Sequence, residues 1–129
     1  MNDKVVIRRL QTGVPGLDTL LGGGLAELSF NLIAGSPGSG KTTLAHQLMF
    51  ALAGPERRAL FFTVLGEPPL KMLRYQQQFS FFDIAKVNDT IRCGNRADEV
   101  MGGEGDRVLA RIIEEVGRFE AGLVFVDSF

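Results

Sequence analysis

The apolar residues of this chain gather in three continuous runs, and segments with helical spacing lie between them. The runs predict strands over residues 27–34, 59–64 and 123–126. Each run has the length of a strand. Residues 59–64 and 123–126 are apolar at nearly every position, and 27–34 alternate and then become fully apolar, as in a buried strand. Such strands, alternating with helices, predict an α/β fold: a mainly parallel sheet between two layers of helices, in a single domain over residues 1–129.

Turn and cap signals divide the rest of the chain. Pro15 opens a short helix that the three glycines at 22–24 end, and Ile91–Cys93 is a weak strand candidate. Val5–Ile7 predicts a short strand or an arm, and 94–105 reads as a glycine-rich loop. Helices are expected at 41–53, at about 69–79 and after Asp106, which is a good N-cap. The last helix places these residues on one face: Val108, Leu109, Ile112, Ile113, Val116 and Phe119.

Residues 35–42 read Gly-Ser-Pro-Gly-Ser-Gly-Lys-Thr, a complete G-x-x-x-x-G-K-[ST] motif. The glycines let the backbone curl so that successive N–H groups point at one anion. Lys41 adds a charge that can reach the outer phosphates, and the Thr42 hydroxyl can ligate Mg²⁺. The expected strand before the loop and helix after it are the setting that this motif requires. The predicted phosphate-binding residues are Gly35, Ser36, Pro37, Gly38, Ser39, Gly40, Lys41, Thr42 and Thr43.

Two acidic residues follow predicted strands and are candidates for the remaining chemistry. Asp127 ends the apolar run 123–126, which is the Walker B arrangement, and is expected to face the Mg²⁺ held by Thr42. Glu67 follows the strand over 59–64. It either positions water at the γ-phosphate, or serves only as a negative charge near the start of the next helix.

Composition removes several other functions from consideration. The net charge is −1, so non-specific attraction to nucleic acid is not indicated. Cys93 and His46 are each the only residue of their type, which excludes an internal disulfide and a zinc-type cluster. The chain shows no secretory signal and no run long enough to span a membrane, so a cytoplasmic location is expected.

His46 and Tyr75 are expected to pack against neighbours, with adenine contact as the alternative for Tyr75.

A family resemblance adds to this interpretation. Residues 12–18 and 21–24, followed by 34–44, resemble the start of a KaiC-like domain of the RecA superfamily. The segment 62–68 is similar to that family's acidic segment after its second strand, and 75–83 extends the likeness over nearly the whole chain. The resemblance implies a RecA-like P-loop NTPase core with ATP and Mg²⁺ as ligands. It also implies that Glu67 and Lys41 are catalytic, with Glu67 the water-activating base, that Thr42 and Asp127 hold the metal, and that the sites lie between subunits of a homo-oligomeric ring.

Two departures from the family pattern bear on this expectation. Many members carry two adjacent acids where this chain has Gly66 before Glu67, which leaves one candidate base. The sequence also stops at Phe129, two residues after Asp127, so the domain is expected to be partial, truncated after the Walker B strand. In RecA-like sheets the next strand lies between the Walker B strand and the strand before the phosphate loop. Without it, these two strands either pair directly, associate with another chain or leave a bare apolar edge.

Two functions follow from different classes of protein. The favoured one is an ATP-binding and ATP-hydrolysing domain that acts in a ring. The alternative is a nucleotide-binding interaction module with negligible turnover, because the C-terminal half is absent. A kinase is a weaker third option, since no acceptor residue can be identified. DNA is a partner elsewhere in the superfamily, but the charge of this chain does not indicate it, and no membrane partner is expected.

Overall fold

The computed structural model describes residues 5–63, 69–95 and 105–127, and within these it leaves out the side chains of 69–72, 94–95 and 105–108. In the described part of the chain no helix is both long and apolar enough to cross a membrane.

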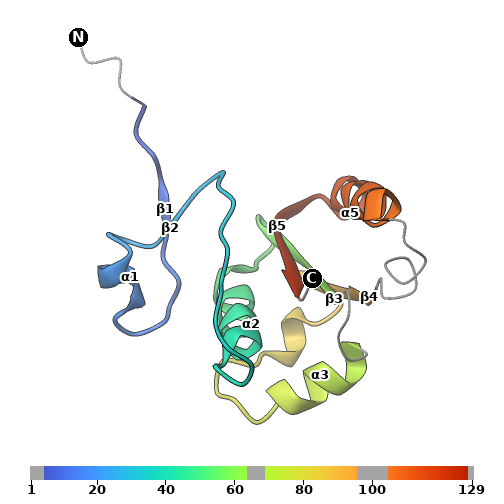
Figure 1. The fold of residues 1–129 in the computed structure, drawn as a ribbon, viewed down its shortest axis with the longest axis horizontal. Helices are drawn as coiled ribbons and strands as arrows, with labels where there is room; N and C mark the ends of the chain where they lie inside the picture. The colour runs from blue at the N-terminus through green and yellow to red at the C-terminus, as the bar shows by residue number, and fades with distance from the viewer. Residues whose placement is uncertain (1–4, 64–68, 96–104, 128–129) are drawn as a thin grey trace.

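A three-stranded parallel sheet forms the centre of the structure (Figure 1). The central strand is β3 (Arg58–Thr63), with β4 (Ile91–Asn95) on one side and β5 (Ala121–Asp127) on the other. Both neighbours run parallel to β3, and Phe61 lies opposite Cys93 and Phe125. The parallel α/β architecture predicted from the apolar runs is confirmed, and it brings the carboxyl ends of all three strands to one edge.

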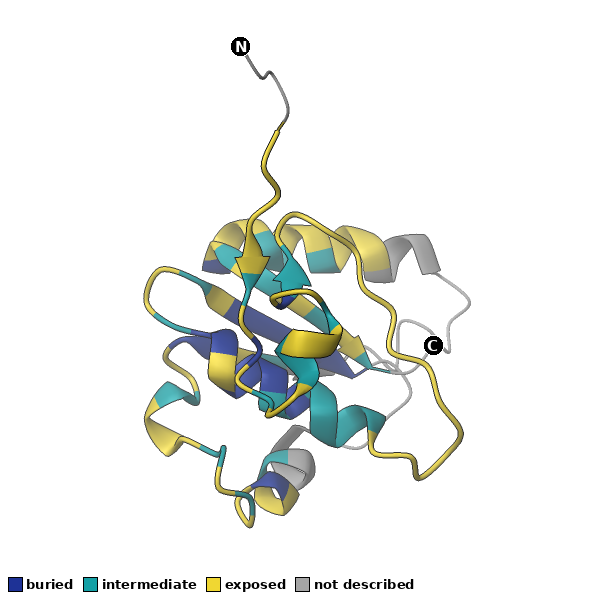
Figure 2. Ribbon diagram, turned by 90° about the vertical axis from the view of Figure 1, so that its left-hand side faces the viewer, coloured by how far each residue is buried: buried dark blue, intermediate teal, exposed yellow. Residues whose placement is uncertain are grey.

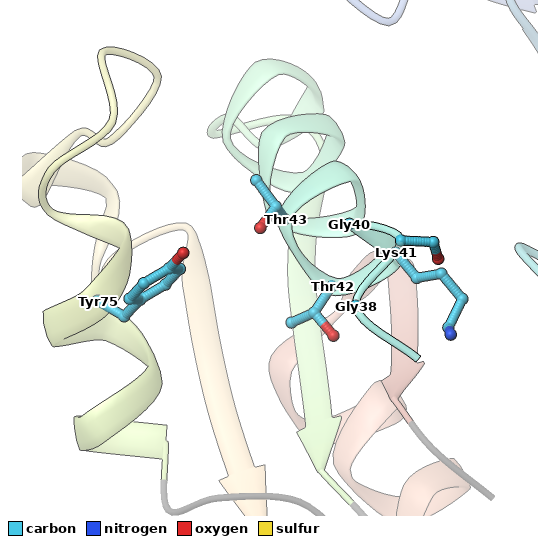
Figure 3. Close-up of a pocket in the computed structure, with 7 residues that line it drawn as sticks. Gly38, Gly40, Lys41, Thr42, Thr43 and Tyr75 are labelled. Atoms are coloured by element: carbon cyan, nitrogen blue, oxygen red, sulfur yellow. The ribbon is translucent and has the colours of Figure 1, made fainter. Parts of the chain in front are cut away.

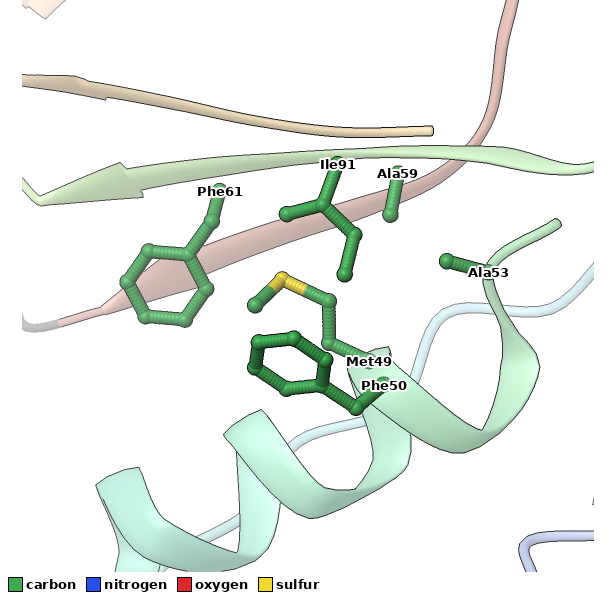
Figure 4. Close-up of a cluster of buried hydrophobic side chains, with 6 residues drawn as sticks. All are labelled: Met49, Phe50, Ala53, Ala59, Phe61 and Ile91. Carbon is green, nitrogen blue, oxygen red and sulfur yellow. The ribbon is translucent and has the colours of Figure 1, made fainter. Parts of the chain in front are cut away.

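Helix α2 (Lys41–Leu52) covers one face of this sheet and forms the main core with it. Figure 4 shows Met49 and Phe50 of α2 pointing at Phe61 and Ile91 of the strands. These four side chains are almost fully buried, and removing any of the large ones would leave a cavity costing roughly 2–5 kcal/mol. At its C-terminal end the helix is tied by Lys86, whose Nζ donates to the carbonyl oxygens of Phe50 at 2.6 Å and Ala53 at 2.8 Å.

Helix α5 (Gly105–Phe119) covers the opposite face. Phe119 is buried against Leu60 and Phe62 of β3, with Ile112 and Val116 packed beside them. The helix begins at Gly105, so Asp106 already lies inside its first turn and the prediction of Asp106 as its N-cap is wrong. The expected apolar face is also only partly buried: Leu109 and Ile113 are 58% and 63% exposed, because they lie to one side of the line of residues that meets the sheet.

Strand β5 differs from the expectation of burial on both faces. Leu123 and Phe125 pack against the core with α2, whereas Val124 and Val126 on the other face are 43% and 36% exposed. The reason is its position. In the described sheet β5 is an edge strand, and α5 lies mainly over β3, so the outer half of β5 on that face has no cover.

The strand predicted over residues 27–34 is not formed, and this prediction is wrong. The chain makes a small antiparallel ribbon of β1 (Arg9–Leu10) and β2 (Leu25–Ala26), and then runs outside the sheet (Figures 1 and 2). Phe30 and Leu32 are 91% and 81% exposed. An apolar run becomes a strand only where another strand offers its backbone groups, and no described strand pairs with this segment. It therefore does not pair directly with β5.

Shorter elements complete the fold. Helix α1 (Leu17–Leu20) follows Pro15 and ends before the three glycines, as predicted, and Asp18 holds it by accepting hydrogen bonds from the Thr12 backbone N–H and hydroxyl, both at 2.8 Å. These bonds lower the pKa of Asp18. Helix α3 (Pro69–Gln76) ends three residues earlier than expected, and the 3₁₀ helix η1 (Ile84–Lys86) leads to β4. Val5–Ile7 forms an exposed arm.

His46 gives this core a dependence on pH. Its ring is fully buried and packs edge-on against Phe61, with 4.6 Å between ring centroids. Neither ring nitrogen has a hydrogen-bond partner among the described residues. Burial lowers the pKa of His46 from 6.5 to about 4, and the negative charge of Asp127 opposes only part of this effect. The structure thus confirms His46 as a packed residue, not an exposed base.

We expect the free energy of unfolding to decrease as the pH falls from 6.5 to about 4. In this window the unfolded chain binds a proton at His46 and the folded chain does not. The contribution of neutral His46 to the free energy of unfolding is therefore present above pH 6.5 and is lost progressively below it. The loss is up to about 3 kcal/mol. Urea unfolding at several pH values measures it. His46→Phe keeps the contact with Phe61 but cannot titrate, so it should lose less stability. An equal loss in both proteins would exclude His46 as the source.

Candidate functional site

The glycine-rich loop has the curled backbone that an anion site requires. Gly38 and Gly40 have φ angles of 79° and 96°, in the left-handed region that side chains rarely adopt. At Gly35 a Cβ atom would lie 2.7 Å from Ser39 Oγ, so a side chain there would force the Ser39 hydroxyl to move. Ser36 and Pro37, like the rest of residues 31–40, are exposed. The loop is therefore open to solvent on the side where a ligand would enter.

The loop leads directly into the N-terminus of α2. Gly40 is the N-cap of this helix, and among the described residues no side-chain cap accepts a hydrogen bond at its first turn. Unsatisfied N–H groups together with the helix dipole favour a negative charge at this position. A phosphate would supply the missing acceptors, so the residues present fit the phosphate chain of a nucleotide.

Lys41 supplies the positive charge at this site. Its Nζ donates to the carbonyl oxygens of Gly35 at 2.7 Å and Ser36 at 3.1 Å, so the ammonium lies over the loop. Both carbonyl groups are neutral, so neither of them compensates the charge of Lys41. A phosphate oxygen would be a stronger partner, because hydrogen bonds between charged groups are the stronger ones.

Thr42 and Asp127 come together from distant parts of the sequence. The hydroxyl of Thr42, in the first turn of α2, donates to Asp127 Oδ2 at 2.9 Å. Asp127 is the last residue of β5, and it lies opposite Thr63 of β3 in the strand register. The pair combines a hydroxyl and a carboxylate oxygen, which are the ligand types that Mg²⁺ prefers. The described residues contain no group of three acidic, histidine or cysteine side chains that could hold a metal alone. At such a pair, phosphate oxygens and water would complete the coordination of Mg²⁺.

A pocket of about 270 Å³ lies at this loop. It is lined by Gly38, Ser39, Gly40, Lys41, Thr42, Thr43 and Tyr75 (Figure 3). Tyr75 comes from α3 and is 58% exposed. Its place at the pocket depends on how α3 packs, and sequence spacing alone does not determine that packing.

The structure brings together the loop, Lys41, Thr42, Thr43 and Asp127 among the residues predicted from the sequence. Glu67 lies outside the described residues. Cys93 takes no part, and burial raises the pKa of its thiol to about 11, which makes it a poor nucleophile at neutral pH. Arg111 is on the outer surface of α5, where it lies 3.8 Å from Glu114.

These features define a class of protein. A glycine-rich loop at a helix N-terminus, with an aspartate at the end of a parallel strand beside it, is the nucleotide site of P-loop NTPases. Residues 10–128 match the family described as ATPase: KaiC. The chain therefore belongs to the KaiC family of ATPase domains, in the RecA superfamily, as the resemblance predicted. Membership supports nucleotide binding in general.

Individual relatives give the same family assignment. The DNA repair protein RadA of Mycobacterium tuberculosis (strain CDC 1551) is 32% identical over 94% of this chain and 22% of its own length. The circadian clock protein KaiC3 of Synechocystis sp. is 34% identical over 95% of this chain and 26% of its own. A UPF0273 protein of Methanocaldococcus jannaschii is 30% identical over 64% of this chain and 34% of its own. The chain thus spans about a fifth to a third of the length of these relatives.

Proposed function

We propose that this chain binds ATP with Mg²⁺ at residues 35–42 and that the assembled domain hydrolyses ATP, releasing its γ-phosphate. The observation that carries the proposal is the hydrogen bond of 2.9 Å between Thr42 and Asp127. These residues are 85 positions apart, and their meeting places a hydroxyl and a carboxylate beside an uncapped helix N-terminus. A nucleotide with its metal needs these groups together, whereas a glycine-rich surface turn does not.

Each residue has a role that follows from its chemistry. The N–H groups of residues 38–42 would bind the phosphate chain, and Lys41 would neutralise the charge on its outer phosphates. Thr42 and Asp127 would hold Mg²⁺. When bound, the metal supplies positive charge at the phosphate oxygens. A cytoplasmic location and assembly into a ring are further parts of the proposal.

Glu67 is the proposed water-orienting base. It follows β3 by four residues, and the last residue of β3, Thr63, is paired in register with Asp127. In hydrolysis the oxygen of water forms a bond to the γ-phosphorus, and the bond from that phosphorus to the bridging oxygen breaks. The products are ADP and phosphate, and Glu67 would take up the proton that the attacking water loses.

A second candidate function is a nucleotide-binding interaction module with negligible turnover. The observation that favours it is the open edge of β5 in the described sheet, where Val124 and Val126 are exposed. An edge of this kind favours association with another strand. The named activities of the relatives, DNA repair and timing, do not decide between the two candidates.

We expect Lys41→Met to weaken ATP binding by about 10- to 100-fold, because it removes a charge-assisted contact to phosphate. Isothermal titration of the full chain with Mg·ATP measures the affinity. Arg111→Met is the matched control, since it removes one positive charge from the exposed surface of α5 and should bind as the parent does. Equal affinity of the parent and Lys41→Met would contradict a phosphate site at this loop.

We expect Glu67→Gln to reduce ATP turnover by about 10²- to 10⁴-fold and to leave ATP affinity within about threefold of the parent. The amide can still accept a hydrogen bond from water but cannot take its proton. Release of phosphate at saturating ATP measures turnover, with Glu56→Gln, at an exposed position, as control. An unchanged rate in Glu67→Gln would remove Glu67 from the mechanism. ATP binding by a parent chain with turnover no higher than that of Lys41→Met would favour the interaction module.

A further inference from the structure

Tyr75 forms the wall of the pocket that faces away from Lys41. Figure 3 shows its ring on α3, across the pocket from Thr42 and Thr43, while the Lys41 ammonium extends on the far side of the loop. The ring is 58% exposed, although it is a large and partly apolar group. Among the described residues that line this pocket, Tyr75 alone comes from outside the segment 38–43.

The position of Lys41 fixes the direction in which a nucleotide would lie. In a loop of this type the lysine reaches the outer phosphates, and the backbone N–H groups hold the inner ones. The end of the pocket remote from Lys41 therefore receives the part of the ligand beyond the inner phosphates, which is the nucleoside. That end is bounded by Thr43 and Tyr75.

A chain of aromatic contacts links Tyr75 to the helix that begins at the loop. Tyr75 meets Phe79 edge to face at 5.7 Å, and Phe79 stacks on Phe81 at 5.3 Å. Phe81 in turn contacts Phe50 of α2 at 5.9 Å. Phe50 is buried in the core, so these contacts position the Tyr75 ring relative to the loop before any ligand binds. Such preorganisation favours a binding surface.

We propose that Tyr75 is the nucleoside-binding residue of this site and that its ring packs against the planar base of the bound nucleotide. This inference rests on the proposed nucleotide site. The contact is made by the face of the ring and reads no base edge, so it should serve ATP and GTP alike. It leaves the binding of a bare phosphate chain to the loop and Lys41.

The composition of the chain provides a direct test. Tyr75 is the only tyrosine and there is no tryptophan, so tyrosine fluorescence reports on this residue alone. Mg·ATP should change this emission with a midpoint equal to the calorimetric Kd, whereas saturating tripolyphosphate should bind without a comparable change. Lys41→Met, titrated in parallel, corrects for light absorbed by ATP. Calorimetric binding of ATP with unchanged tyrosine emission would overturn the inference and leave the proposed function standing.

Variants at position 75 give a second, independent readout. We expect Tyr75→Ala to weaken ATP binding by about tenfold and to leave tripolyphosphate binding within about twofold. Tyr75→Phe keeps the ring and should bind both as the parent does. Gln77→Ala, an exposed neighbour that lies after α3, is the control. Equal losses for both ligands in Tyr75→Ala, or a loss in Tyr75→Phe as large as in Tyr75→Ala, would contradict a contact between ring and base. A parent chain that binds neither ligand would overturn this inference and the proposed site together.

Discussion

The hydrogen bond between Thr42 and Asp127 is the constraint on which the site depends. It joins the first turn of α2 to the last residue of β5, and so it fixes the glycine-rich loop against the carboxyl edge of the sheet. The core sets up this contact from a distance. Met49 and Phe50 hold α2 against the sheet, while Phe125 of β5 packs into the same cluster. The parallel order of β5 and β3 then carries Asp127 to the edge where α2 begins.

The loop itself combines a curled backbone with unsatisfied polar groups. Glycines at 38 and 40 allow its left-handed turns, and the uncapped start of α2 leaves N–H groups without partners in the described structure. Replacing a good N-cap costs a helix roughly 1 kcal/mol. The anchoring of α2 in the core offsets such a cost, and the N–H groups at its exposed N-terminus remain available to bind an anion. Stability and binding therefore reside in opposite ends of one helix.

Much of the fold could be predicted from the sequence, because these elements are encoded by local patterns of residues. Continuous apolar runs predicted β3 and β5, and helical spacing with glycine and proline signals predicted α2. The glycine-rich motif likewise indicated which residues would surround an anion. Residues 27–34 were predicted wrongly because an apolar run does not reveal whether a partner strand is present. The prediction that Val124 and Val126 are buried was wrong for the same reason, because their burial depends on what lies beyond the edge of β5. The place of Tyr75 at the pocket depends on aromatic contacts between α3 and α2, which no motif encodes.

The central claim is that Thr42 and Asp127 form a metal-dependent nucleotide site, and the magnesium dependence of ATP binding in Asp127→Asn tests it most directly. Asparagine can still accept the hydrogen bond from Thr42, so the fold is preserved while the negative charge is removed. Titration calorimetry with and without Mg²⁺ should show that the metal strengthens ATP binding in the parent chain. In Asp127→Asn most of this gain should disappear, with metal-free affinity unchanged or higher. An equal magnesium effect in both proteins would contradict the account.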